Sequence, residues 1–204
     1  MTDPPPSRHI LLLAIVFEGG LIVLAMVLGW LLNRPSLELI QPSWRGVLIG
    51  LALTVPLVPL MLWCSRSRWG PIRQLMVEVD AVIVPLFARS SLFDLAIIAL
   101  LAGLGEELLF RGLVQNGLTD LAGTAIALVV TSLGFGLLHM VTPTYALLAT
   151  VFGLYLGGLL LVTGDIVVPI VTHVAYDMIA LSHLKQRWHE GGVTGGASRS
   201  RVTK

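Results

Sequence analysis

Charged side chains are scarce in this sequence. Asp, Glu, Lys and Arg make up 12% of its 204 residues, whereas an average soluble domain contains about 25%. Hydrophobic residues account for 55%, and a water-soluble globule of this size cannot bury that much apolar surface. The composition therefore excludes a cytosolic enzyme, a nucleic-acid-binding protein and a disordered chain, and it predicts an integral membrane protein.

Cysteine is nearly absent as well. The single thiol, Cys64, excludes an internal disulfide framework and a cysteine-based metal cluster. The chain contains no His-Glu-x-x-His sequence, and no serine lies in a nucleophile elbow. Two common hydrolase arrangements, the serine triad and the zinc-binding helix, are therefore not indicated.

Long apolar runs are what the sequence does contain. A hydrocarbon core about 30 Å thick needs roughly 20 apolar residues per helix. Six runs meet this requirement, at about 10–32, 46–64, 92–118, 122–140, 144–163 and 166–184. We expect an all-α fold, a polytopic transmembrane bundle of about six membrane-spanning helices. Pro56 and Pro59 should bend the second of them.

A seventh helix, from Pro71 to Ala88, has a different pattern. Its apolar residues recur on one helical face, namely Ile72, Leu75, Met76, Val79, Ile83 and Leu86. This pattern predicts an amphipathic helix lying at the membrane interface. A connector helix packed on the bundle is an equally good interpretation.

The predicted domain organisation is simple. Residues 1–9 form an N-terminal tail, residues 10–184 a single transmembrane domain with its catalytic core at about 90–184, and residues 185–204 a disordered basic tail. The first apolar run is too long for a signal peptide and is followed by no cleavage site, so we expect it to be retained.

The positions of Lys and Arg predict the orientation. With six spans and the N-terminus inside, ten of the thirteen fall on the inner side: Arg8, Arg66, Arg68, Arg73, Arg89, Lys185, Arg187, Arg199, Arg201 and Lys204. Arg34 and Arg45 fall outside, and Arg111 lies within a helix. We expect a multi-pass protein of the cell inner membrane with both termini in the cytoplasm.

Ionisable groups at bilayer depth are costly and mark functional sites. In Glu106-Glu107-Leu108-Leu109-Phe110-Arg111, Glu107 and Arg111 are four residues apart, so they share a helical face and can pair. Glu106 lies about 100° away around the helix and has no partner in its own helix. If Arg111 holds Glu107 ionised, Glu106 is the carboxylate left to act as a general base. The alternative is a buried ion pair that fixes helix packing.

Two further pairs lie on later runs. Phe135 precedes His139 by one turn and can form a wall of its pocket, while His173 and Asp177, at i and i+4, share a face. Glu18, followed by two glycines, either lines the same pocket or has a structural role. Asp94 is interpreted as a favourable charge at the N-terminus of its helix.

A helical hairpin with its turn near residues 121–123 would bring the first two groups together. Glu106 and His139 are 33 residues apart, so both would lie about 24 Å from that turn. His173 and Asp177, below a turn at Gly164-Asp165, would lie within reach. Carboxylates, an arginine and two histidines can thus converge on one intramembrane pocket that is equipped to activate water.

The three motifs resemble those of the CAAX prenyl endopeptidases and bacteriocin-processing enzymes, the Abi family. Its pattern of Glu-Glu-x-x-x-Arg, Phe-x-x-x-His and His-x-x-x-Asn or Asp on successive transmembrane helices occurs here in order. The resemblance covers about residues 90–184. It implies a glutamate-type intramembrane endopeptidase that acts on membrane-anchored or lipidated proteins or peptides within the lipid bilayer, with no nucleic-acid partner.

The resemblance also implies a role for each residue. Glu106 would activate water with the help of His139, His173 and Asp177 would form an oxyanion-binding corner, and Glu107 and Arg111 would position Glu106. Phe135 is assigned to substrate binding. Asp177 stands where Asn is commoner, so it is either protonated or orients His173. We expect no cofactor and no metal ligand, because Arg111 disfavours a dication; zinc bound by two histidines and a glutamate is the alternative.

Two other classes of function remain open at this point. A non-catalytic membrane adaptor or immunity protein could use the same fold to bind a partner. A proton-coupled transporter would also bury Glu, Arg and His, but it predicts an internal repeat, and none is evident in the sequence.

Overall fold

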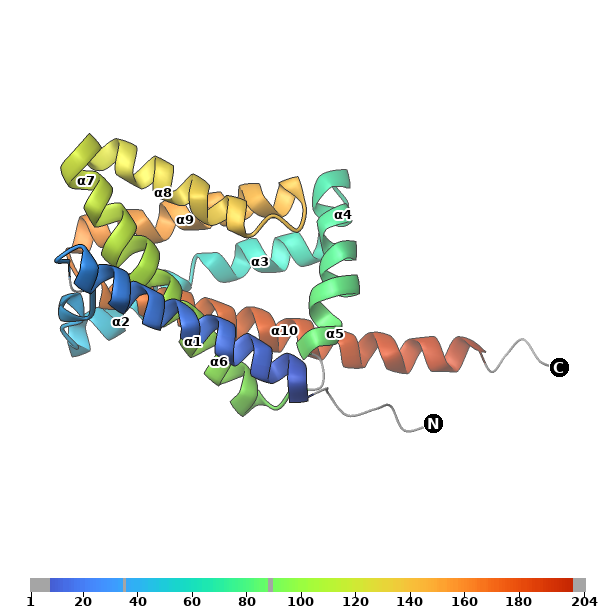
Figure 1. Ribbon diagram of the computed structural model, residues 1–204. Coiled ribbons are helices and arrows are strands. Elements are labelled where there is room, and N and C mark those ends of the chain that lie inside the picture. The colour runs from blue at the N-terminus through green and yellow to red at the C-terminus, as the bar shows by residue number, and fades with distance from the viewer. Residues whose placement is uncertain (1–7, 35, 88–89, 200–204) are drawn as a thin grey trace.

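The computed structural model describes residues 8–34, 36–87 and 90–199 (Figure 1). Within these ranges the secondary structure is helical and no residue is in a β-strand. In chain order the elements are α1 (Arg8–Leu31), the 3-10 helix η1 (Ser36–Leu39), α2 (Trp44–Thr54), α3 (Leu57–Arg66), α4 (Gly70–Glu78), the π-helix η2 (Val79–Ile83), α5 (Val84–Phe87), α6 (Leu92–Glu107), the π-helix η3 (Leu108–Gln115), α7 (Asn116–Ala122), α8 (Thr124–Leu138), α9 (Pro143–Thr163) and α10 (Val167–Arg199). The predicted all-α polytopic class is confirmed.

The number of spans is close to the prediction but not identical to it. Within the part of the chain that the structure describes, four helices are long and apolar enough to cross a membrane: His9–Leu31, Trp44–Arg66, Pro143–Thr163 and Val167–Trp188. A fifth arises if the bent pair Gly70–Phe87 and Leu92–Ala122 is one broken span. The predicted run at 122–140 is only 15 residues of helix, shorter than the roughly 20 residues that a full crossing needs.

The second span is interrupted where the prolines predict it. α2 ends at Thr54 and α3 begins at Leu57, so the break contains Pro56. Proline lacks an N–H group and its ring clashes with the preceding turn, so it interrupts the helical hydrogen bonds.

The predicted amphipathic helix is present as the continuous unit α4, η2 and α5. Figure 1 shows this unit at one end of the bundle, steeply inclined to α3 and α10. Ile72 and Leu75, from the predicted apolar face, are buried, and so is Val84, which lies outside that predicted set. Asp80 on η2 accepts a hydrogen bond from Arg187 on α10 (2.9 Å). The helix therefore packs on the bundle, and its position relative to the membrane interface stays a prediction.

The C-terminal helix differs from the predicted tail. α10 continues to Arg199, past the predicted domain end at residue 184. Two basic residues at the start of that tail make specific contacts, because Lys185 donates to the Ser90 carbonyl (2.5 Å) and Arg187 pairs with Asp80. The predicted tail residues 1–7 and 200–204 lie outside the described residues, as does Arg89.

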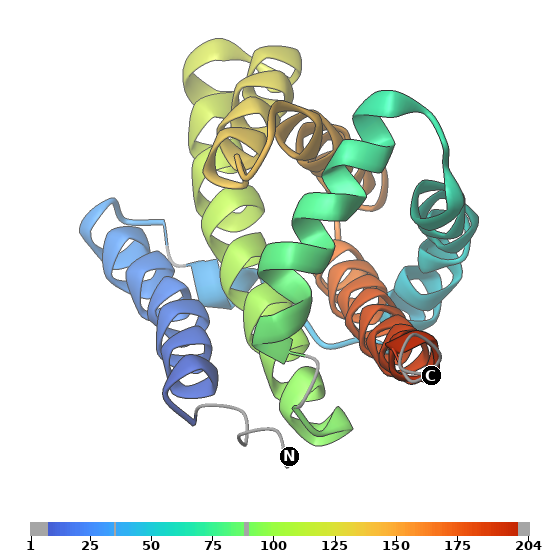
Figure 2. The same ribbon diagram turned by 90° about the vertical axis from the view of Figure 1, so that its right-hand side faces the viewer.

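α6 and η3 form the centre of the helical bundle. α1 packs along one side of α6, and α10 packs along another (Figures 1 and 2). α6 begins with a capping box in which Ser91 and Asp94 exchange side-chain and backbone hydrogen bonds, so the prediction that Asp94 serves its helix N-terminus is confirmed. The described core around this element contains both apolar residues and the polar groups of the candidate site.

Candidate active site

The three predicted motifs meet at one place. The first motif lies on α6 and η3, with Glu106 and Glu107 at the end of α6 and Arg111 in η3. The second and third motifs lie on α8 with its C-cap, which hold Phe135 and His139, and on α10, which holds His173 and Asp177. The predicted hairpin is present: α7 and α8 are joined at Gly123, whose φ of 85° lies in the region that favours glycine. The turn before α10 contains Gly164, which also has a positive φ of 66°.

The first motif forms a buried ion pair. Arg111 Nη1 donates to Glu107 Oε1 at 2.8 Å, and both side chains are fully buried. Arg111 Nη2 donates to the Gly153 carbonyl at 3.0 Å, and the guanidinium lies 4.6 Å from the centre of the Phe135 ring. These contacts compensate the charge of Arg111 inside the core, as a buried cation requires. Arg111 lies in the π-helix η3, a distortion that is frequent at functional sites.

His173 connects the ion pair to the other carboxylates. Its Nδ1 lies 2.9 Å from Glu107 Oε1, and its Nε2 lies 3.8 Å from Glu106 Oε2 and 3.5 Å from Asp177 Oδ2. Glu107 therefore accepts hydrogen bonds on one oxygen from both Arg111 and His173 when the imidazole Nδ1 carries a proton. The ring is fixed in one orientation, with Nε2 directed toward two acids.

His139 approaches Glu106 from the opposite side. It caps the C-terminus of α8, and its Nδ1 lies 2.8 Å from the Phe135 carbonyl. A carbonyl oxygen can only accept, so Nδ1 carries the proton and Nε2 of the neutral ring presents a lone pair. That Nε2 lies 3.7 Å from Glu106 Oε1. The hairpin therefore brings Glu106 and His139 to the same level, as their spacing predicts.

Glu106 lies between the two imidazoles. Its side chain is largely buried, with 7% of the residue exposed. Its Oε2 is buried without a hydrogen-bond partner among the described residues. The distances of 3.7 and 3.8 Å to the two Nε2 atoms exceed hydrogen-bond length. Glu106 is thus a carboxylate with basic groups on both sides and without a bond to the nearby arginine.

Phe135 is part of the wall, but its neighbours are mostly other site residues. Its ring stacks on His139 (centroids 4.4 Å apart) and meets Phe110 edge to face (5.1 Å). Only 2% of the residue is exposed. These contacts hold the His139 ring, whereas the assignment of Phe135 to substrate binding stays a prediction.

The sequence did not single out two kinds of residue at the site. Tyr145, Phe152 and Tyr176 supply aromatic contacts to the two histidines and to one another, but aromatic residues within apolar helices carry no distinctive signal. The second kind is a pair of glycines on α9, Gly153 and Gly157, whose Gly-x-x-x-Gly spacing is typical of helix packing. Their carbonyls accept from Arg111 and from Gln115, so this face of α9 binds the polar side of η3 within the same chain.

The alternative of a zinc site depends on how these side chains are arranged. Among the residues described, no group of three or more His, Cys, Asp or Glu side chains is arranged to hold a metal ion. Zinc requires about four ligands at 2.0–2.3 Å, and Glu107 is already engaged by Arg111 and His173. The arrangement therefore does not fit a zinc site.

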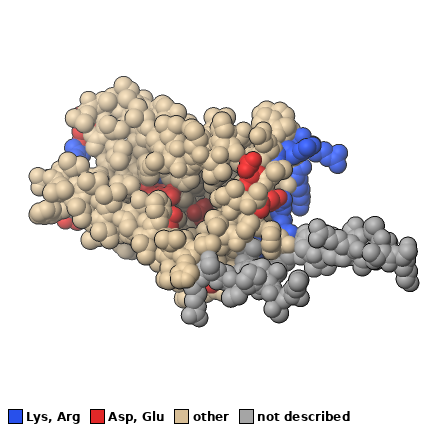
Figure 3. Space-filling model, turned by 45° about the vertical axis from the view of Figure 1, so that its right-hand side comes forward, with Lys and Arg blue, Asp and Glu red and all other residues tan. Residues whose placement is uncertain are grey.

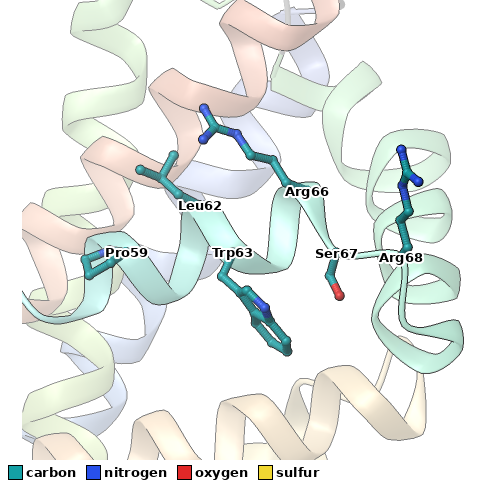
Figure 4. A pocket seen from close by; sticks show the side chains of 6 residues that line it. All are labelled: Pro59, Leu62, Trp63, Arg66, Ser67 and Arg68. Carbon is teal, nitrogen blue, oxygen red and sulfur yellow. The ribbon is translucent and has the colours of Figure 1, made fainter.

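A separate cavity of about 540 Å³ lies at the end of α3. It is lined by Pro59, Leu62, Trp63, Arg66, Ser67 and Arg68. Figure 4 shows the two arginine side chains pointing to the same side of the chain, away from Trp63 and Ser67 and well apart from each other. The cavity contains none of the predicted site residues, and its two guanidinium groups do not converge.

Comparison with known families supports the grouping of these motifs. A family model described as type II CAAX prenyl endopeptidase Rce1-like matches residues 88–179. Comparisons with curated proteins and with solved structures found no match. The matched segment includes all seven predicted site residues and agrees with the range over which the motifs resemble the Abi family. The match over residues 88–179 supports the assignment of this segment to the CAAX protease family, with the Rce1-like type II prenyl endopeptidases as the matching model.

Proposed function

We propose that this protein is a glutamate-type intramembrane endopeptidase in which Glu106 and His139 activate water. The family match supports a membrane protease of the CAAX type in general. The observation that carries the finer proposal is the position of Glu106, a buried carboxylate without a hydrogen bond on Oε2 and with an imidazole Nε2 on either side.

In the proposed first step, a water molecule is bound between Glu106 and His139. The 3.7 Å separation of Glu106 Oε1 and His139 Nε2 is too long for a direct hydrogen bond and suits a shared hydrogen-bonding partner. Glu106 accepts a proton from this water as its oxygen attacks the scissile carbonyl carbon. Because Nδ1 of His139 carries its proton, the Nε2 lone pair can accept a hydrogen bond from the same water.

His173 would stabilise the oxyanion that forms. Its Nδ1–H donates to Glu107, so Nε2 can donate to an oxyanion only if the ring is an imidazolium. We propose that form for the active protein, with Asp177, 3.5 Å from Nε2, orienting the ring rather than contacting the oxyanion itself. Donors directed at a developing negative charge contribute strongly to catalysis in a low-dielectric site.

The proposed hydrolysis ends with proton transfer to the leaving amine. The proton that Glu106 accepted from water is donated to the amide nitrogen as the carbon–nitrogen bond breaks, which regenerates the carboxylate. Glu107 and Arg111 act through their neighbours: Glu107 holds His173, and Arg111 holds Glu107. We propose membrane-anchored or lipidated proteins or peptides as substrates, in keeping with the membrane-protein substrates of the family.

Catalysis without a metal can be tested directly. Purified protein treated with a strong chelator is expected to keep its peptidase activity. Loss of activity on chelation, with recovery on addition of zinc, would contradict the glutamate-base mechanism.

The decisive experiment compares cleavage products in host membranes. Glu106→Gln and His139→Ala are each expressed beside the wild type, with Glu38→Gln and His9→Ala as controls at exposed positions outside the site. New peptide ends in the membrane proteome are then mapped by mass spectrometry. We expect wild type and controls to produce ends that both site variants lack. Identical ends from all five proteins would refute the protease proposal, and survival of the cellular function in both site variants would favour the adaptor or immunity alternative.

A further inference from the structure

A third carboxylate reaches the site from a helix outside the matched segment. α1 packs along α6 (Figure 2). The two helices approach closely at Gly105, where an added Cβ would lie 2.8 Å from the backbone oxygen of Glu18. Because Gly105 has no side chain, the backbone of α1 at Glu18 can lie directly against α6, next to Glu106.

The carboxylate of Glu18 faces the candidate site. It lies near enough to Asp177, His173 and Glu106 for their charges to interact. Its Oε2 is buried, and no described residue forms a hydrogen bond to it. The sequence left two interpretations of Glu18 open, and the buried oxygen within electrostatic range of the site residues favours the one in which it lines the pocket.

Acidic groups outnumber the available cations here. Glu18, Glu106 and Asp177 form no ion pair with any Lys or Arg of the described residues. The buried cation nearby, Arg111, is engaged by Glu107 and by the Gly153 carbonyl. The proposed imidazolium of His173 lies 3.8 Å from Glu106 and 3.5 Å from Asp177, so one positive charge faces two acids, and Glu18 adds a third. Figure 3 shows a hollow near the centre of one face with Asp and Glu atoms inside it, while the Lys and Arg of that face gather mainly at one end.

The unpaired acid at the centre of this group is Glu106. It is more than nine-tenths buried, and its Oε2 has no hydrogen-bond partner. Buried carboxylates ordinarily have a partner, because leaving one unpaired in a low-dielectric medium is costly. Because the proposed mechanism gives Glu106 a bound water and His173 as a neighbour, the carboxylate left without a counter-charge is that of Glu18, whose Oε2 is also buried without a described hydrogen-bond partner. A cationic group of the substrate can supply that charge.

We propose that Glu18, together with Asp177, selects substrates that carry a Lys or Arg side chain close to the scissile bond. The inference rests on the proposed function and adds the charge class of the substrate. In this arrangement Glu18 is a specificity residue: it binds the cationic side chain, while Glu106 remains the group that acts on water. A positive charge in the substrate is attracted more strongly here than in water, because the surroundings are apolar.

The test uses full-length protein reconstituted in liposomes with a set of apolar membrane-inserted peptides. Within each peptide, Lys, Arg, Gln or Glu occupies one of the positions flanking the cleaved bond. For the wild type, we expect kcat/KM for the best Lys or Arg peptide to exceed that of the matching Gln peptide by at least about tenfold. The Glu peptide should be the poorest, because like charges repel.

Variants separate specificity from stability. Glu18→Gln is expected to reduce the Lys-to-Gln ratio of kcat/KM to near one, and Glu18→Asp to restore part of it. Glu38→Gln, which removes an exposed carboxylate on η1, should keep the wild-type ratio. If Glu18→Gln does not fold, the wild-type profile and the Glu18→Asp variant still give the answer.

The possible outcomes are distinct. Wild-type protein that cleaves Lys, Arg and Gln peptides equally would overturn this inference and leave the proposed function standing. An unchanged ratio in Glu18→Gln would overturn the role of Glu18. Wild-type protein that cleaves no peptide of the set would overturn the proposed function together with the inference.

Discussion

The matched segment, residues 88–179, and the helices before it divide the molecule into two unlike regions. In the first region, the 18-residue apolar stretch of each candidate span is mostly exposed: 6% of it is buried inside the protein in His9–Leu31 and 11% in Trp44–Arg66. In Pro143–Thr163 and Val167–Trp188 the shares are 28% and 33%. The early helices thus expose most of their apolar surface at the periphery, while the later ones enclose the polar core.

The comparison shows that hydrophobicity and burial are different properties in a membrane protein. α1 is strongly apolar, yet Leu13, Val16 and Phe17 are exposed. By contrast, four ionisable residues, Glu106, Glu107, Arg111 and His173, are buried in the matched segment. Lipid is as apolar as a leucine side chain, so polar groups need the protein interior more than apolar ones do. Glu18 is the exception that connects the peripheral region to the core.

The largest expected effect lies at the centre of the matched segment. Glu106→Gln keeps the size of the side chain and removes the base, so kcat for a cleaved peptide should fall about 100- to 10,000-fold. Glu38→Gln in the peripheral region should leave kcat unchanged. Steady-state kinetics in detergent or liposomes measure both, and equal activity of the two variants would remove the functional distinction between the regions.

The next effect is on stability. Arg111→Met leaves Glu107 buried without its cation, and removing one partner of a buried pair costs about 3–5 kcal/mol of unfolding free energy. Arg45→Met changes an exposed arginine of α2, and we expect a change within about 0.5 kcal/mol. Denaturant-induced unfolding in micelles compares the two. Similar midpoints would mean that the buried pair contributes little to folding.

A smaller effect is expected where the two regions meet. Gly105→Ala introduces a methyl group against the backbone of α1, and such overpacking costs about 1–3 kcal/mol. Gly134→Ala, on α8, meets no atom within 4 Å of the added Cβ and should not lower stability, because alanine favours a helix over glycine. Thermal unfolding of the two variants tests this pair. A Gly105→Ala protein as stable as Gly134→Ala would show that α1 can move away from α6 without penalty.

The smallest effect is expected at the peripheral ion pair between η2 and α10. Asp80→Asn removes a carboxylate that is 46% exposed and pairs with Arg187. Partly exposed pairs contribute about 0–1 kcal/mol, so the midpoint of thermal unfolding should shift only slightly. A loss comparable to that of Arg111→Met would mean that η2 is fixed to the bundle as firmly as the core pair is.

Much of the fold could be predicted because it depends on local patterns. The apolar runs gave the helices, and Pro56 and Gly123 mark the break and the turn that the sequence indicates. The number of spans was less accessible. α8 ends at Leu138, with His139 as its cap, and α9 begins at Pro143. The residues on both sides of this break are apolar, so hydropathy alone does not show where the helix ends. Contacts also extend α10 through the start of the predicted tail.

The candidate site divides in the same way. Spacing within one helix predicted that Glu107 can pair with Arg111 and that Asp177 can reach His173, and both contacts are present. Spacing could not predict that His173 Nδ1 contacts Glu107, or that the carbonyls of Gly153 and Gly157 accept from η3. Those contacts join residues of different helices.

The sequence by itself determined that this is an all-helical membrane protein and which polar residues its helices carry into the apolar interior. These properties follow from composition and from the fixed geometry of a single helix, 1.5 Å and 100° per residue. Only the tertiary structure decided which carboxylate is engaged by Arg111 and His173, which one is left between two imidazoles, and that Glu18 lies beside them. Those outcomes depend on the depth and rotation of each helix relative to its neighbours, which are set by close packing at residues such as Gly105.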